Sequence, residues 1–493
     1  MSYFETYLEK TKEIGYITSL SHSVAYVSGL PGLRPEEMVI TNTGKRGIVH
    51  GLKKELAEIL MIDIKELKIG EAVVRAEKPF EIPITQELLG RIINPLSQPT
   101  DGLGPIKGEK VYQPVKKEAP SLIKRVRVNT PLESGVMLVD FLVPIGYGQR
   151  ELIIGDGKTG KTAFLLQTIV SQAKKGVVCV YVGIGKKDTA IKWVEEYLKL
   201  QKVFDQTIII HTAPDDSPTL TYLAPYSGMS IAEYFRDKGK KVIIILDDLT
   251  THAKIYREIS LLLKRMPGRD SYPGEIFHIQ AALLERAGNI KNKEGKEASI
   301  TALPVAETLE NDLSGYIQTN LMAMTDGHIF FDINEFRKGK RPAINAFLSV
   351  SRVGNQTKAP IERKLSGWMR KKLVEYQRLL EITQFGAELP AEIQRSIEFG
   401  EKLEFLFNQE IETIIPRKLQ LLLVGLLLSG FWENKSLRKM KEEIDKLSQN
   451  YQRGVLPEFK EEIEIMMIEE IKDFDHLQFL MKEIMPEIEK TIS

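Results

Sequence analysis

The sequence predicts a multidomain chain with an N-terminal β-barrel, a central α/β domain built on a parallel sheet, and an all-α C-terminal domain. Three observations support this prediction. Short runs that alternate apolar and polar residues fill residues 14–75, as in a small all-β domain. Between residues 149 and 354, continuous β-branched runs alternate with helical stretches, which is typical of a parallel sheet covered by helices. After Lys358 the pattern is helical to the end.

The N-terminal part contains short strand-like runs separated by turn sequences. The runs read IGYITSL, SVAYV, EEMVITN and GIVHGL, and the turns between them include GLPGLRP and TGKRG. Glycine and proline at such spacing end strands and start turns. The runs carry no aromatic or basic stripe that would bind a ligand. We therefore predict a structural barrel over residues 1–78.

The rest of the chain divides into a central and a C-terminal part. Residues 78–149 read as a connector punctuated by proline and glycine, and the strands that follow read VVCVYVGIG, TIIIHTA, KVIIILDDLT and GHIFFD. We assign residues 79–355 to the central domain and residues 356–493 to the helical domain. Within the latter, LQLLLVGLLL is the predicted buried helix.

The composition argues against several classes of function, among them nucleic-acid binding. The chain has 493 residues, 43% apolar and 27% charged, with a formal net charge of +1; near-neutrality argues against nucleic acid as a partner. The single cysteine, Cys179, lies in an apolar run, where a thiol usually acts as a small hydrophobe. The N-terminus lacks an apolar signal core. The longest apolar run, residues 419–432, is too short to span a bilayer, so we expect membrane association only through partners.

The most informative stretch is ELIIGDGKTGKTAFLL at residues 151–166. It matches the phosphate-binding loop spacing G-x-x-x-x-G-K-[ST] between a predicted strand and a helix expected to begin near Lys161. The glycines allow backbone N–H groups to turn around a phosphate, and the positive end of the helix faces the same phosphates. A chance match would lack the flanking strand and helix. The predicted phosphate-binding residues are Gly155, Asp156, Gly157, Lys158, Thr159, Gly160, Lys161 and Thr162.

A cation site is predicted next to this loop. Lys161 is expected to reach the β- and γ-phosphates, and the Thr162 hydroxyl to bind Mg²⁺. The run KVIIILDDL ends in a carboxylate pair, and an aspartate at such a strand end commonly holds the metal, often through its waters. On its own the pair could equally be a helix cap. After a matched phosphate loop we assign Asp247 to Mg²⁺ and Asp248 to the following turn.

The residues after the preceding strand bear on catalysis. A hydrolytic site of this architecture needs a carboxylate there to orient the attacking water, but the sequence GIGKK provides Lys186 and Lys187. A lysine can act as that base only if its pKa is strongly depressed. We therefore expect slow turnover or none at this site.

At this point the chain resembles a known family, the alpha subunit of the rotary F-type ATP synthase. The similar segments read VPIGYGQRELIIGDGKTGKTA, DDLTTHAKIYREISLLLKRMPGRDSYPGEIFHIQAALLERAG, SITALPVAETL and RPAINAFLSVSRVGNQTK. They occur in the family's order and cover nearly the whole chain. The resemblance implies a RecA-like central domain whose site binds ATP or ADP with Mg²⁺ and is the non-catalytic one of a ring of alternating alpha and beta subunits.

The resemblance also implies roles for two further residues. Arg352, in SVSRVG, matches an arginine finger that reaches the γ-phosphate of the adjacent beta subunit, although a lone arginine is more often a surface or ion-paired residue. Gln409 matches a residue of the adenine pocket. Ile411 stands where a second glutamine is expected, and the loop reads GDGKTGKT where the family usually has GDRQTGKT. The departures suggest a divergent member.

As partners, the resemblance implies beta subunits, the gamma shaft, and the delta subunit of the peripheral stalk. The membrane sector that moves protons or sodium ions is contacted only indirectly. The implied location is peripheral, on the cytoplasmic face of a bacterial plasma membrane or the equivalent for an organelle-encoded subunit. Two alternatives remain: a self-sufficient homohexameric secretion or export ATPase, disfavoured by the lysine at residue 186, and an RNA-translocating ring, for which no basic, aromatic-lined RNA site is evident.

Overall fold

The computed structural model describes residues 2–292, 294–383, 390–453, 468 and 471–492. They form two compact units. The first contains Met1–Arg127, Tyr147–Gly157 and Ala173–Asp326, and the second contains Val128–Gly146, Lys158–Gln172 and Gly327–Ser493. The boundaries drawn from the sequence at residues 78 and 355 stay a prediction. Parts of the predicted helical domain lie outside the described residues, at 384–389 and 454–467.

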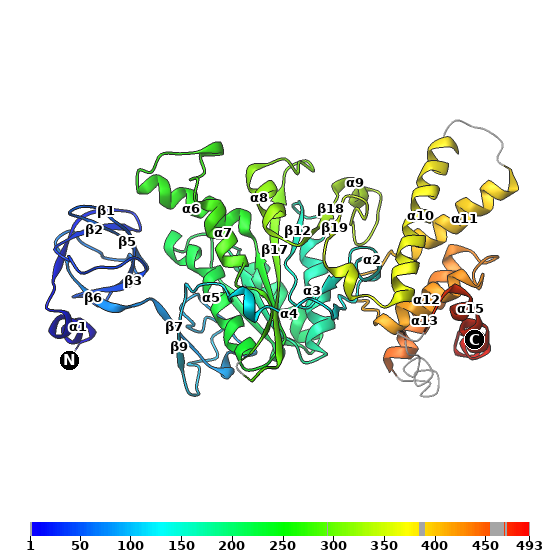
Figure 1. The fold of residues 1–493 in the computed structure, drawn as a ribbon, viewed down its shortest axis with the longest axis horizontal. Helices are drawn as coiled ribbons and strands as arrows, with labels where there is room; N and C mark the ends of the chain where they lie inside the picture. The colour runs from blue at the N-terminus through cyan, green and yellow to red at the C-terminus, as the bar shows by residue number, and fades with distance from the viewer. Residues whose placement is uncertain (1, 293, 384–389, 454–467, 469–470, 493) are drawn as a thin grey trace. The chain divides into compact units, whose positions relative to one another are not determined.

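The first unit begins with a short helix, α1 (Tyr3–Thr11), and a closed barrel (Figure 1). Its strands are β1 (Gly15–Ser21), β2 (Val24–Ser28), β3 (Glu37–Thr41), β4 (Arg46–Leu52), β5 (Ala57–Met61) and β6 (Ala72–Pro79). They pair in the order β1-β2-β5-β4-β3-β6, and β1 closes the barrel by pairing Gly15 with Val73 of β6. Inward residues such as Ile17, Val39 and Ile59 are almost fully buried and form its core. The predicted barrel is confirmed.

A parallel sheet forms the centre of the first unit. Its strands run in the order β12 (Glu151–Asp156), β17 (Glu297–Thr308), β15 (Val242–Asp247), β13 (Val178–Gly183), β14 (Thr207–His211) and β8 (Ile92–Ile93). Each neighbouring pair is parallel, and β16 (Gly288–Lys291) adds an antiparallel partner to β17. These strands are buried on both faces, as their β-branched runs predict.

Helices and one further small sheet complete this unit. The helices are α4 (Asp188–Leu200), α5 (Pro218–Asp237), α6 (Leu249–Leu262), α7 (Ile276–Leu284) and α8 (Tyr316–Met324). Helix α5 packs against β13 and β15, and it begins at a Ser217 cap followed by proline, a typical helix start. The predicted connector contributes more than a link: β7 (Glu81–Ile84) pairs with β9 (Val111–Pro114), and β8 extends the central sheet.

A buried ion pair fixes α5 to the turn after α7. Arg286 and Glu233 are 1% and 3% exposed, and the guanidinium contacts both carboxylate oxygens at 2.9 and 2.8 Å. Arg286 also donates to the Val115 carbonyl at 2.8 Å and to the Ser230 hydroxyl at 2.9 Å. Because every contact of this guanidinium is buried, its removal would leave the buried Glu233 carboxylate with Lys117, 3.3 Å from Oε2, as its remaining ion-pair partner.

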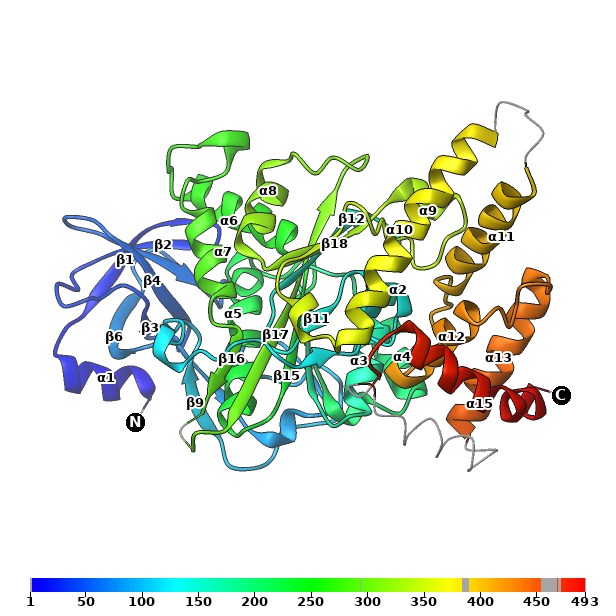
Figure 2. The same cartoon turned by 45° about the vertical axis from the view of Figure 1, so that its right-hand side comes forward.

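The second unit holds the helical C-terminal part (Figure 2). Its helices include α10 (Pro360–Thr383), α11 (Ala391–Leu406), α12 (Arg417–Leu428), α13 (Leu437–Arg453) and α15 (Phe474–Ile492). Helices α10 and α11 lie side by side, and α15 packs on α12 and α13. Every residue of α12 from Leu419 to Leu427 is buried, which confirms the predicted buried helix. The predicted fold class, a barrel, a central α/β domain and a helical C-terminal part, is confirmed.

Shorter elements of this unit precede or follow the phosphate loop. They are β10 (Pro131–Leu132), α2 (Met137–Leu142), β11 (Ile145–Gly146), α3 (Lys161–Ala173), β18 (Gly327–Phe331), α9 (Ile333–Arg337) and β19 (Val350–Ser351). Across the described ranges, no helix combines the length and the apolar character needed to cross a membrane.

Two ionisable groups, Asp140 of α2 and the buried Lys358, have pKa values shifted by their surroundings. The Lys358 ammonium donates to the Phe141 carbonyl and, at 2.6 Å, to the Ser366 hydroxyl. Burial lowers the pKa of Lys358 to about 7, although Glu362 and Asp140 act to raise it. Burial likewise raises the pKa of Asp140 to about 6, against the hydrogen bonds from Gln420 and Ser134. Arg370 and Arg417 add to the lowering at Lys358.

We expect Lys358→Met to stabilise the chain near neutral pH and to lose that advantage in alkaline solution. The folded pKa of Lys358 lies below its unfolded value, so the native amine carries a stability cost that grows as pH falls from about 10.5 to about 7. At pH 7 the gain would be on the order of a few kcal/mol, and the Phe141 carbonyl keeps the Ser366 hydroxyl at 2.7 Å. Thermal unfolding at pH 7 and pH 10 measures the effect.

Lys371→Met is the matched control, because Lys371 is an exposed lysine of α10, the helix that begins two residues after Lys358. It should change the unfolding temperature little at either pH. An equal shift for Lys358→Met at both pH values would contradict the buried, weakly basic amine.

Candidate nucleotide-binding site

The first half of the phosphate loop follows β12 in the first unit. Gly155 has a φ of 155°, and Asp156 is held by the Thr308 hydroxyl at 2.5 Å and the Asn311 amide at 3.0 Å. Thr308 is the last residue of β17, the neighbouring parallel strand. Asp156 therefore connects the start of the loop to the carboxyl edge of the sheet. Its carboxylate has this structural role as well as any contact with a ligand.

The second half of the loop leads into α3 in the second unit. This helix begins at Lys161, as the sequence predicts. Thr159 and Lys161 are buried and Thr162 is half-buried. Gly160 has a φ of 103°, in the region that favours glycine. Our expectation that Gly157 also needs this freedom is not met, because the neighbouring Lys158 has the positive φ, 63°.

Asp247 and Asp248 lie at the carboxyl end of β15, on the sheet edge where β12 also ends. Asp247 is 4% exposed, and its Oδ2 accepts a hydrogen bond from the Tyr181 hydroxyl at 2.6 Å. Asp248 caps α6 by accepting from the Thr251 amide at 2.6 Å. The structure thus places Asp247 at the same edge of the sheet as the start of the loop, with β17 between the two strands, and gives Asp248 the turn-ordering role that we predicted.

Lys186 makes the contact that the sequence did not reveal. Its Nζ lies 2.8 Å from Oδ1 of Asp247 and 3.0 Å from Oδ2 of Asp248. Desolvation favours the neutral amine, but the two carboxylates outweigh it and raise the pKa of Lys186 above its ordinary value. The side chain therefore remains an ammonium and cannot accept a proton from water.

This pairing bears on the Mg²⁺ predicted at Asp247. The carboxylate is engaged on both oxygens, by Lys186 and by Tyr181, so a divalent cation held there would share it with a fixed ammonium. Asp247 as found does not fit a simple magnesium ligand.

Gln409 has a structural environment in the second unit. Its Oε1 accepts from the Met137 amide at 3.1 Å, and its Nε2 donates to the carbonyls of Gly135 and Thr413, each at 2.6 Å. Gln167 of α3 reaches the adjacent carbonyl of Glu410 at 3.0 Å. The Gln409 amide thus joins the loop after α11 to the segment before α2, and its predicted contact with adenine stays a prediction.

Arg352 follows β19 and is exposed. The loop that carries it is fixed, because the Ser351 hydroxyl donates to the Pro144 carbonyl at 2.6 Å and accepts from the Gly354 amide at 3.2 Å. A Cβ on Gly354 would lie 1.7 Å from the Pro144 oxygen, so only glycine fits there. Within the described part of the chain, Arg352 has no carboxylate at ion-pair distance.

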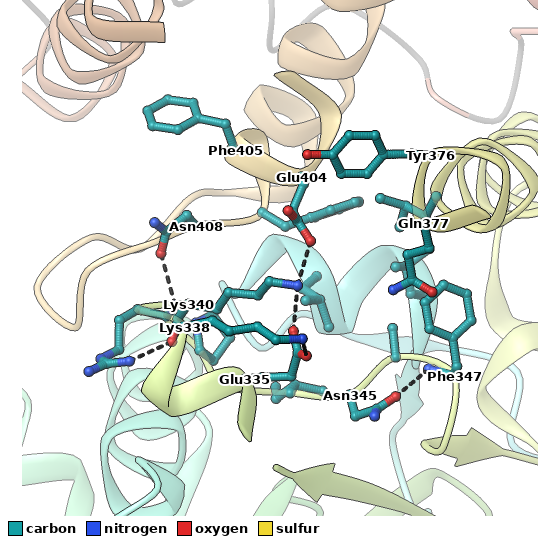
Figure 3. Close-up of a pocket in the computed structure, with 18 of the residues that line it drawn as sticks. Glu335, Lys338, Lys340, Asn345, Phe347, Tyr376, Gln377, Glu404, Phe405 and Asn408 are labelled. Carbon is teal, nitrogen blue, oxygen red and sulfur yellow. Dashed lines mark hydrogen bonds and ion pairs between the residues drawn. The ribbon is translucent and has the colours of Figure 1, made fainter. Parts of the chain in front are cut away.

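A separate cavity of about 900 Å³ opens in the second unit. Figure 3 shows Lys340 between Glu335 and Glu404, which both pair with its ammonium. The lining also contains Tyr376 and Phe405. None of the phosphate-loop residues lines it, and the lining carries both carboxylates and cations.

The chain matches known proteins over most of its length. Residues 135–351 match the nucleotide-binding domain of the ATP synthase alpha/beta family, and residues 356–482 match the C-terminal domain of its chains. The chain belongs to the ATP synthase alpha/beta family. Within this family it is similar to alpha subunits.

Three relatives from bacteria illustrate the similarity. The chain is 39% identical over 488 residues to ATP synthase subunit alpha of Dictyoglomus turgidum, covering 98% of this chain and 94% of the relative. The alpha subunit of Dictyoglomus thermophilum is 42% identical over 438 residues, covering 89% and 86%. That of Acholeplasma laidlawii is 39% identical over 441 residues, covering 89% and 88%. Membership of the ATP synthase family associates this site with nucleotide binding and ATP synthesis.

In this ATP synthase family member, the sequence did not reveal Tyr181 as a site residue, and it did not reveal the partners of Lys186. Tyr181 reaches Asp247 only because β13 pairs with β15 in a register that sets Gly183 opposite Asp247. Lys186 was singled out for its position, but its partners depend on the same strand order. The hydrophobic pattern of VCVYVG indicates a buried strand but does not indicate either contact.

Proposed function

We propose that this chain is the non-catalytic, ATP-binding alpha subunit of an F-type ATP synthase head. One observation carries the proposal: the position that needs a water-activating carboxylate holds Lys186, and its ammonium is paired with Asp247 and Asp248. General-base catalysis requires a group that can accept a proton near neutral pH. A nucleotide bound here would therefore persist.

In this function the loop from Gly155 to Thr162 binds the phosphates. Lys161 contacts the β- and γ-phosphates, and the Thr162 hydroxyl remains the proposed protein ligand of Mg²⁺, which would neutralise phosphate charge when bound. The positive end of α3 faces the same oxygens. Gln409 positions the neighbouring loop and is the proposed contact to the base.

The proposed assembly is a ring in which three such subunits alternate with three beta subunits around a gamma shaft, with a delta subunit on the peripheral stalk. Arg352 is the proposed arginine finger, and its exposure without an ion-pair partner in the described residues supports action on another chain. ATP synthesis or hydrolysis would be coupled to proton or sodium transport. The head would sit peripherally on the cytoplasmic face of a bacterial membrane.

Purification tests this proposal against a self-sufficient homohexameric export ATPase. The full chain should hydrolyse ATP at a negligible rate alone and should form an active complex when co-expressed with its beta subunit. Rapid hydrolysis by a homohexamer of the isolated chain would overturn the proposal. Steady-state phosphate release and the mass of the purified particle are the two measurements.

A further inference from the structure

A positive charge is already built into the place where an ATPase site holds its metal ion. Lys186 Nζ contacts one oxygen of Asp247 and one of Asp248, at 2.8 and 3.0 Å. The carboxylate side chains are 6% and 3% exposed, and that of Lys186 is 23% exposed. The contact is therefore shielded from solvent on the carboxylate side and open on the lysine side.

The lysine is held by its backbone as well as by its charge. Its amide donates to the Thr212 carbonyl at 3.0 Å, and its carbonyl lies 2.8 Å from Nε2 of His211. The preceding Gly185, with a φ of 62°, donates to the Thr212 hydroxyl at 3.0 Å. These bonds attach the segment to the end of β14, so the ammonium is positioned by the sheet and is not a mobile surface group.

The two carboxylates are also held in place without the lysine. Tyr181 donates to the other oxygen of Asp247, and the Thr251 amide donates to the other oxygen of Asp248. Each carboxylate thus presents one oxygen to a structural donor and one to Lys186. An ammonium has three N–H groups; the carboxylates account for two, which leaves one for an oxygen of a bound phosphate or of water.

We propose that the Lys186 ammonium acts as a resident cation at Asp247, so that this site binds a nucleoside triphosphate or diphosphate with little dependence on Mg²⁺. The inference rests on the proposed nucleotide site. A hydrated divalent ion at Asp247 would meet a fixed positive charge on the oxygen it needs. In the proposed site the same ammonium would supply the positive charge and the hydrogen-bond donor that a metal would otherwise bring to the phosphates.

The consequence is a measurable loss of coupling between metal and nucleotide. Where Mg²⁺ and nucleotide bind together, each raises the affinity of the other by the same factor. In the native chain we expect the ATP dissociation constants with excess MgCl₂ and with EDTA to agree within about threefold. In Lys186→Gln the metal should strengthen binding by roughly tenfold or more, within the range typical of coupled ligands.

Isothermal titration of the full-length chain with ATP, in MgCl₂ and in EDTA, tests the proposal. Lys187→Gln is the matched control, since it removes an adjacent, exposed lysine and leaves Lys186 and its two carboxylates intact. It should behave as the native chain does. Lys186→Arg keeps a cation at the position and should restore weak dependence on the metal.

The outcomes separate this inference from the proposed function. ATP binding by the native chain that is strongly magnesium-dependent would overturn the inference and leave the nucleotide site standing. Lys186→Gln with the native ratio would overturn the assignment to Lys186. An absence of ATP binding in both buffers would overturn the proposed site itself. If Lys186→Gln fails to fold, the ratio of the ATP dissociation constants of the native chain in EDTA and in MgCl₂ still tests whether binding depends on the metal.

Discussion

Arg352→Ala is expected to lower ATP turnover by the assembled complex by roughly 10³-fold or more, the range found for arginine fingers. The guanidinium is exposed, and its loop is anchored by Ser351 on the Pro144 carbonyl. Alanine removes a cation that would stabilise charge on a transferring phosphoryl group in the adjacent subunit. The measurement is the rate of multisite ATP hydrolysis by the purified complex. The mass of the complex shows whether it has assembled.

Two variants sharpen this test. Arg378→Ala removes an exposed arginine from α10 in the same unit and should leave turnover unchanged. Arg352→Lys keeps the charge but loses the planar fork that engages phosphate oxygens in pairs, so it should recover only part of the rate. Full multisite activity in Arg352→Ala, with the complex intact, would remove Arg352 from this role.

Arg286→Ala is expected to destabilise the first unit by about 3–5 kcal/mol, the cost of breaking a buried ion pair by removing one partner. Glu233 is 3% exposed. Burial acts to raise the pKa of Glu233, but the hydrogen bonds and charge of Arg286, with Lys117 and Arg236, hold that pKa below its ordinary value. Without the guanidinium, that carboxylate keeps only the partly exposed Lys117 as an ion-pair partner and loses both hydrogen bonds from Arg286. The midpoint of urea unfolding of the full chain measures the loss.

A double substitution and a surface pair serve as controls. Arg286→Met combined with Glu233→Leu replaces both charges by apolar groups, and it should recover much of the lost stability because no unpaired charge remains. Glu196→Gln breaks an exposed pair with Lys192, at 4.0 Å with both side chains more than half exposed. It should change stability by no more than about 0.5 kcal/mol. A double variant as unstable as Arg286→Ala would show that packing, not charge, carries the effect.

Local patterns predicted the parts of the fold that depend on nearby residues. Alternation in IGYITSL indicated a barrel strand because one face of β1 is buried, and continuous runs such as KVIIILDD indicated strands buried on both faces. The start of α3 at Lys161 followed from the loop motif, whose last glycine ends the turn. These features need no knowledge of which strands become neighbours.

What failed depends on neighbours that sequence spacing does not give. The two-residue strand β8 lies in a stretch that reads as a connector, and it joins the sheet only through β14. Lys186 meets Asp247 because β13 and β15 are adjacent. The positive φ lies at Lys158 and not at Gly157. The sequence motif could not predict this, because the conformation of the turn depends on the fold around it. Gln409 is engaged by backbone groups more than 270 residues earlier in the chain, at Met137 and Gly135.

The pairing of β1 with β6 leaves the N-terminal barrel without a free strand edge. A sheet that ends in an unpaired strand can recruit a foreign segment through its main-chain amides and carbonyls, which leads to aggregation or strand exchange. The closed barrel has no unpaired strand edge at which a foreign strand could add. Any neighbouring chain must recognise it through side chains and loops, so the specificity of such a contact lies in its surface residues and can change without disturbing the hydrogen-bonded frame beneath.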